Sequence, residues 1–206
     1  MENNENKYLK LARRAREENN TEDAKKYYDM VRTENPDNTE ARFFYSYYRL
    51  WDGTKGEAYG KFIDFLNVVI PVVKSVAASD DSDEEKEKLV EDMYSSVQGL
   101  TMSVRSIQID LFNAGKDQKY NKQKNSCEKN GTEMLYKFGD ALEASFAGNA
   151  KILAVAVNAW KKAVSQQQQF PYCGLDKTLP EKYLPKIQKV DPSFTLPKKA
   201  GCISFK

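Results

Sequence analysis

Apolar residues recur at helical spacing from the start of the chain, and polar breaks divide them into separate segments. The pattern predicts three helices within residues 7–52, because intervals of three and four residues place side chains on one face of a helix. Thr21 is suited to cap the second helix, and Asn35 ends it, since a residue before proline is disfavoured in the α region. The apolar positions are Tyr8, Leu11, Ala12 and Ala15, then Ala24, Tyr27, Tyr28 and Val31, then Phe43, Phe44, Tyr45, Tyr47, Tyr48, Leu50 and Trp51.

The middle of the chain predicts longer helices. Residues 57–78 are apolar on nearly every side, which is typical of a core helix, here kinked at Pro71. A heptad seam over residues 90–111 predicts one continuous helix, which pairs with a second over residues 120–146 at the shallow angle of a bundle. Another buried helix is expected over residues 150–168. The seam residues are Val90, Met93, Val97, Leu100, Val104, Ile107 and Leu111.

Prolines mark a change after residue 170. Five of them within 27 residues predict an extended tail with at most one short helix, near residues 181–189. Apolar anchors along the tail indicate that it packs on the bundle, since they would otherwise be exposed. The alternative is that the tail is itself a ligand for another molecule. The anchors are Tyr183, Ile187, Phe194, Ile203 and Phe205.

The first helices resemble a tetratricopeptide repeat over residues 5–52. Six positions agree with its helix signatures and closing proline: Tyr8, Leu11, Ala12, Ala24, Tyr28 and Pro36. Ala15 and Val31 depart from the family pattern. The resemblance covers about one and a half repeats, fewer than such solenoids need, so it implies that other helices complete the core. Similar segments occur in bacterial proteins beside a short zinc ribbon, for which this chain has no C-x-x-C pair.

Together these patterns predict an all-α protein. A tetratricopeptide-like hairpin is expected to pack on a bundle of long antiparallel helices, followed by an extended C-terminal tail. The expected divisions are residues 1–52, 53–170 and 171–206, with the first boundary placed at Gly53 and Gly56 because two nearby glycines interrupt the helical pattern.

Composition narrows the function. A net charge of +2 argues against a protein dominated by nucleic-acid phosphate contacts, and the lysines within residues 116–129 fit a solvated helix face. Three widely spaced cysteines and an N-terminus without an apolar signal segment fit the cytoplasm. The run between Lys61 and Lys74 is too short and polar to span a membrane. We therefore expect no nucleic-acid partner and no membrane span.

The sequence contains few of the residues and motifs that commonly carry catalysis. The chain has no histidine, which removes the commonest general base and most transition-metal sites. It also has no phosphate-binding loop and no nucleophile-elbow motif. The acidic residues 79–85 lack the order of a calcium loop and fit a helix N-terminus instead. We expect a non-enzymatic protein without a metal or cofactor.

The resemblance also implies a binding surface. In tetratricopeptide proteins the inner face of each first helix lines a groove for an extended peptide. The lysine and asparagine that clamp a C-terminal carboxylate in chaperone-binding members are replaced by Leu9 and Arg13, so that ligand is not implied here. Two guanidinium groups beside aromatic rings instead suit an acidic or C-terminal segment with an apolar side chain. The alternative is that the arginines are solvated and the aromatic residues are core. The implied groove residues are Leu9, Arg13, Arg16, Phe43, Tyr47 and Trp51.

Two classes of function remain open. The first is an interaction or scaffold protein that uses this groove to bind a protein or peptide, as a monomer or weak dimer because the heptad seam has an internal mate. The second is a helical ligand-binding or sensor protein that holds a small molecule within the bundle. A buried polar residue in the seam would favour the second class, and Ser96, Ser103 and Gln108 are not well placed for that role.

Overall fold

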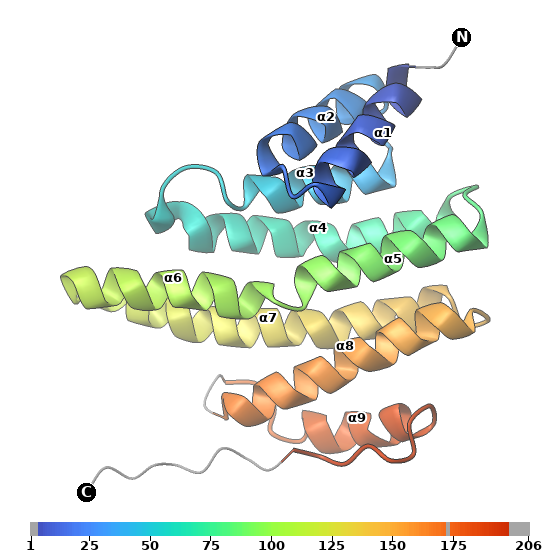
Figure 1. Ribbon diagram of the computed structural model, residues 1–206. Helices are drawn as coiled ribbons and strands as arrows, with labels where there is room; N and C mark the ends of the chain where they lie inside the picture. The colour runs from blue at the N-terminus through green and yellow to red at the C-terminus, as the bar shows by residue number, and fades with distance from the viewer. Residues whose placement is uncertain (1–3, 172–173, 198–206) are drawn as a thin grey trace, which may run out of the picture. The chain divides into compact units, whose positions relative to one another are not determined.

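The computed structural model describes residues 4–171 and 174–197. Within these ranges the chain is helical and has no strand, so the prediction of an all-α protein is confirmed (Figure 1). The helices group into two compact units, one ending at Asp81 and the other beginning at Ser82. The boundary expected at residue 52 lies inside the first unit, because the helix that follows it packs on the aromatic helix before it.

Three short helices open the first unit: α1 (Asn4–Glu17), α2 (Thr21–Glu34) and α3 (Thr39–Arg49). Asn20, rather than Thr21, caps α2, since its side chain accepts a hydrogen bond from the Asp23 N–H at 3.2 Å. Asn38 caps α3 in the same way through the Ala41 N–H at 2.9 Å. The predicted positions of these helices are therefore confirmed.

A short 3₁₀ turn, η1 (Lys55–Glu57), leads into α4 (Ala58–Ala78), which packs on α3. The large apolar residues that nearly encircle α4 are all buried or half-buried, as expected of a core helix. A stripe of exposed residues runs along it: Gly60, Asp64, Asn67, Pro71, Lys74 and Ala78. The opposite face is buried, with Phe65 lying 5.3 Å from Phe43 between ring centres. Across the described ranges, no helix has the length and apolar character needed to cross a membrane.

Four helices form most of the second unit: α5 (Asp83–Val97), α6 (Leu100–Gly115), α7 (Gln118–Ser145) and α8 (Ala150–Gln169). The single continuous helix expected over residues 90–111 is wrong, because the chain breaks at Gln98 and Gly99. A glycine costs a helix interior about 1 kcal/mol. The break also lets the two halves of the seam meet different partners. α6 lies along α7, as expected (Figure 1), whereas α5 packs on α8.

Two glycines allow α7 to approach its neighbours closely. A Cβ atom at Gly131 would overlap the Thr101 side chain of α6. At Gly139 it would overlap the indole of Trp160 in α8 and lie 2.9 Å from the Ala156 carbonyl oxygen. These glycines therefore make room for helix packing, which outweighs their low intrinsic helix propensity.

The described part of the tail lies against the second unit. Its one helix, α9 (Leu179–Gln188), is close to the short helix expected at residues 181–189 and packs on α8. Tyr183 and Ile187 are buried, and the Tyr183 ring centre is 4.4 Å from that of Tyr136. The anchors Ile203 and Phe205 lie outside the described residues.

Candidate functional site

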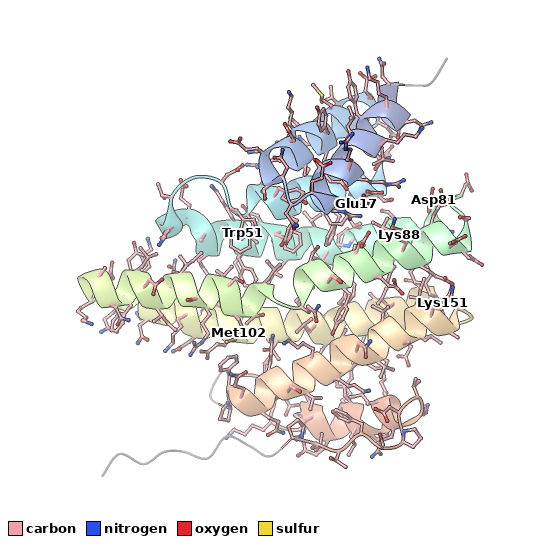
Figure 2. All side chains as sticks on the ribbon, in the orientation of Figure 1. Glu17, Trp51, Asp81, Lys88, Met102 and Lys151 are labelled. Carbon is pink, nitrogen blue, oxygen red and sulfur yellow. The ribbon has the colours of Figure 1, made fainter. Side chains whose placement is uncertain are left out.

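The aromatic residues of the implied groove lie in different environments. Phe43 is 0 % exposed and belongs to the core. Tyr47 is half-buried, with its ring centre 5.9 Å from Phe65 and 6.4 Å from Trp51. Trp51, labelled in Figure 2, is 38 % exposed, and Leu9 on α1 is half-buried. Only part of the aromatic face therefore remains available to a ligand.

Arg13 is engaged within the protein. Its Nη2 donates to Oε2 of Glu40 at 2.6 Å, and its Nε lies 2.9 Å from the same oxygen. Glu40 is 6 % exposed and also accepts a hydrogen bond from the Tyr28 hydroxyl at 2.8 Å. Burial and the nearby Glu40 carboxylate raise the pKa of Tyr28, so this hydroxyl keeps its proton. Arg16 places its guanidinium 4.2 Å from the centre of the Phe44 ring.

The geometry of Arg13 identifies a structural role. The carboxylate of Glu40 joins α1, through Arg13, and α2, through Tyr28, to α3. An Arg13→Glu change would set a second carboxylate beside Glu40 and disturb this joint. Loss of binding in such a variant would therefore not by itself locate a groove.

A hollow of about 270 Å³ lies between α3 and α4. Its lining residues are spaced as on one face of a helix. They cover about one turn at the end of α3 and two turns of α4. Leu50 and Phe65 are each 1 % exposed and form an apolar base, whereas charged side chains stand on the rim. The lining residues are Ser46, Arg49, Leu50, Lys61, Asp64, Phe65 and Val68. None of the six implied groove residues lines the hollow, although Tyr47 adjoins it through Phe65.

The charges on the rim differ in how far they are neutralised. Lys61 donates to the Asp52 carbonyl oxygen and lies 3.4 Å from Oε2 of Glu57. Within the described ranges, by contrast, no carboxylate pairs with Arg49 and no cation pairs with Asp64. Arg49 and Asp64 are therefore the rim charges open to a ligand, one on each helix.

The sequence did contain a signal for this hollow. Positions 46, 49 and 50, and positions 61, 64, 65 and 68, each mark one face of a helix and mix apolar with charged residues. The expectation that α4 is a core helix gave no separate role to its narrow charged face. Only the pairing of α3 with α4 brings the two sets together.

The second unit contains one dense polar cluster on α7 and α9. The Tyr183 hydroxyl donates to Oδ2 of Asp140 at 2.5 Å, and Lys186 Nζ lies 3.1 Å from Oδ1 of Asp140 and 2.6 Å from Oε2 of Glu143. Burial and then Asp140 raise the pKa of Tyr183. Burial alone would lower the pKa of Lys186, but its hydrogen bonds to Glu143 and Asp140 raise it overall.

These raised pKa values keep both Tyr183 and Lys186 protonated near neutral pH. A general base must be able to accept a proton near the working pH, which neither group does. The four side chains also satisfy one another. The geometry is therefore that of a contact that holds α9 on the bundle.

Buried amides form a second polar feature of this unit. Gln108 is 0 % exposed, and neither its amide nitrogen nor its amide oxygen has a hydrogen-bond partner in the described ranges. Thr132 donates to Gln166 at 3.2 Å, and Tyr136 donates to Gln167 at 3.0 Å. The expectation that Gln108 is poorly placed in the seam is wrong, because its side chain is buried.

Among the described residues, no three side chains of the types that bind metals gather in one place. Comparison of the chain with protein-family models, with curated proteins and with solved structures gave no match. The tetratricopeptide resemblance thus rests on the six sequence positions alone.

Proposed function

We propose that this chain is a non-enzymatic protein–protein interaction module, monomeric or weakly dimeric, that binds a partner through its first unit. The observation that carries the proposal is the hollow between α3 and α4. An apolar base with a charged rim, set between two helices, suits the side chains of a docked peptide or helix. Its volume of about 270 Å³ is enough for a large apolar side chain of a partner.

The surroundings of the hollow support the same function. Trp51 is 38 % exposed and contacts Tyr47, which in turn contacts the base at Phe65. Exposed tryptophan and tyrosine side chains are enriched among residues that dominate binding energies at interfaces. The first unit also carries the six positions that resemble a tetratricopeptide repeat, on the neighbouring helices α1 and α2 and at Pro36, and this resemblance favours peptide binding.

Site-specific crosslinking tests the proposal. The photoreactive residue p-benzoylphenylalanine is placed at Trp51 in one variant and at Glu22, an exposed position on α2, in a control. In cells of the native host, light should join the Trp51 variant to a discrete protein partner, identified by mass spectrometry. Adding Ser46→Trp, which fills the hollow, should remove that adduct.

The Glu22 control and the circular dichroism spectra are needed to interpret the crosslinking result. Each variant must keep the helical spectrum of the parent chain. Equal adducts from Glu22 and Trp51, or no adduct from either, would reject an interaction surface at this place.

Gln108 favours a second candidate function, a polar ligand held within the bundle of the second unit. A buried amide without partners costs about 1–3 kcal/mol for each unsatisfied group, and a bound molecule would offset that cost. Mass spectrometry of the protein under native conditions, after isolation from its host, should then show an added mass. The added mass should disappear in Gln108→Leu, and its absence from the parent protein would reject this candidate.

A further inference from the structure

We infer that the hollow between α3 and α4 recognises a protein segment that inserts one large apolar side chain and sets a carboxylate against Arg49. This inference rests on the proposed function and adds the chemistry of the partner. Three properties of the hollow support it: its apolar base, the unequal neutralisation of its rim charges, and its length.

The base is built for a single apolar anchor. Leu50, which directly follows α3, meets Phe65 and Val68 of α4 there, and Leu50 and Phe65 are each 1 % exposed. From Lys61 to Val68 the lining extends over two turns of α4, about 10 Å at the rise of an α-helix. That length accommodates one leucine, methionine or phenylalanine together with its neighbours along a partner segment.

The rim gives the segment a direction. Arg49, exposed on α3, has no carboxylate partner in the part of the chain that the structure describes. Its planar guanidinium can bind a carboxylate through two parallel hydrogen bonds. Asp64 on α4 repels a carboxylate and favours a cation, whereas Lys61 is already held by Asp52 and Glu57. An acidic residue of the partner is therefore expected on the α3 side of the apolar anchor.

The same features disfavour other occupants. A nucleic-acid phosphate would meet the unpaired carboxylate of Asp64 on the rim. If the hollow bound apolar side chains regardless of charge, Arg49→Glu would leave binding unchanged. This charge reversal is therefore the decisive variant.

The test uses a random-peptide library displayed on phage and selected against the full chain. Enriched peptides should share one leucine, methionine or phenylalanine with an aspartate or glutamate within one helical turn. Their affinity is measured by fluorescence anisotropy with synthetic peptides. Arg49→Glu should weaken binding about tenfold or more, and replacing the acidic residue of the peptide by lysine should restore it, as expected of a direct charge pair.

A matched control lies on the same helix. Arg42 also has no carboxylate partner among the described residues but does not line the hollow, so Arg42→Glu should leave affinity within about twofold. The neutral variant Arg49→Gln gives an intermediate loss and guards against a folding defect in the reversal. Ser46→Trp should abolish binding of every enriched peptide.

The outcomes separate the two claims. Peptides that bind Arg49→Glu as well as the parent, or that carry no acidic residue, overturn the inference while the crosslink from Trp51 would still support an interaction module. A library that yields no enriched peptide, together with no crosslink, overturns both. Loss of binding in Arg42→Glu equal to that in Arg49→Glu shows a general charge effect and also rejects the inference.

Discussion

At the scale of single residues, Glu40 shows how one buried carboxylate joins three helices. Its side chain accepts hydrogen bonds from Arg13 on α1 and Tyr28 on α2, while its own backbone belongs to α3. Removing one partner of a buried pair costs more than the pair contributes, because the remaining groups lose their hydrogen bonds without regaining water. Glu40 thus links three helices of the first unit through hydrogen bonds of one buried carboxylate.

Glu40→Ala should lower the free energy of unfolding by about 2–3 kcal/mol, which is less than for a fully buried pair because Arg13 keeps contact with solvent. Urea denaturation followed by circular dichroism measures the change. As a control, Glu18→Ala removes the exposed pair with Arg14 and should leave stability nearly unchanged. Equal losses in the two variants would show that Glu40 has no special role.

Cys127 is a thiol that the fold conceals. It is 0 % exposed, and burial, followed by the nearby Glu128 carboxylate, raises its pKa to about 12. Because the thiolate is the reactive form, Cys127 should resist iodoacetamide at about pH 8 in the native protein and react once urea is added. Peptide mapping by mass spectrometry distinguishes it from the other two cysteines. Rapid labelling of native Cys127 would contradict its burial.

At the scale of elements, glycines decide how the helices of the second unit meet. Gly139 lies inside α7 where the helix approaches Trp160 and the backbone of Ala156. Gly99 stands at the break between α5 and α6, with no atom within 4 Å of where a Cβ would be placed. The first glycine is required by packing, whereas the backbone and surroundings of the second would accept another residue.

Gly139→Ala should therefore destabilise the protein by about 1–2 kcal/mol, since overlap with Trp160 outweighs the gain in helix propensity. Gly99→Ala is the matched control and should change stability by less than about 0.5 kcal/mol. Thermal denaturation of both variants provides the comparison. A more stable Gly139→Ala protein would mean that α7 and α8 lie farther apart than the structure shows.

The segment that follows α9 carries a pH-dependent contact. Lys161 on α8 donates to Asp191 at 2.6 Å, and this bond, with that from Ser193, lowers the pKa of Asp191 to about 2. A carboxylate with a lowered pKa stabilises the folded state above its ordinary pKa, and that contribution is lost as the pH falls from about 4 to 2. Trp160 lies beside Tyr183 of α9, with ring centres 5.8 Å apart, and can report release of the helix.

The variant Trp51→Phe leaves Trp160 as the only tryptophan. In this variant the fluorescence emission of Trp160 should shift to the red as the pH falls from about 4 to 2. Asp191→Asn removes the titrating group, so part of the shift should disappear and the starting spectrum should already be redder. An identical pH profile in the two proteins would show that other carboxylates govern the release of α9.

At the scale of the whole molecule, the chain forms two compact units that divide between Asp81 and Ser82. Each has its own buried core, built around Phe43, Phe44 and Phe65 in the first and around Leu135, Phe138 and Trp160 in the second. A unit with its own core can fold by itself if it buries enough apolar surface.

Fragments that end at residue 81 or begin at residue 82 should therefore each be helical. The sum of their far-ultraviolet circular dichroism spectra should match that of the intact chain. The smaller fragment is expected to melt first, because a shorter chain buries a smaller share of its surface. A fragment without helical signal would show that its core needs the rest of the chain.

The sequence by itself determined the features that depend on neighbouring residues. The stop before Pro36 and the short helix of the tail follow from chemistry within a few positions, and the structure has them close to where they were expected. The cap of α2 is Asn20 rather than Thr21. The all-α class followed in the same way from apolar spacing. Binding by the first unit stays a proposal, because it depends on surfaces formed by tertiary packing, which apolar spacing in the sequence cannot predict.

Only the tertiary structure decided which faces meet. The heptad seam could not reveal its break at Gly99, because either half satisfies the same spacing and the choice depends on whether α7 or α8 lies opposite. Arg13 and Glu40 are 27 residues apart, so no local pattern joins them. The hollow likewise needs α3 beside α4. Contacts between distant residues carry most of the burial in a core, and spacing along a chain cannot record them.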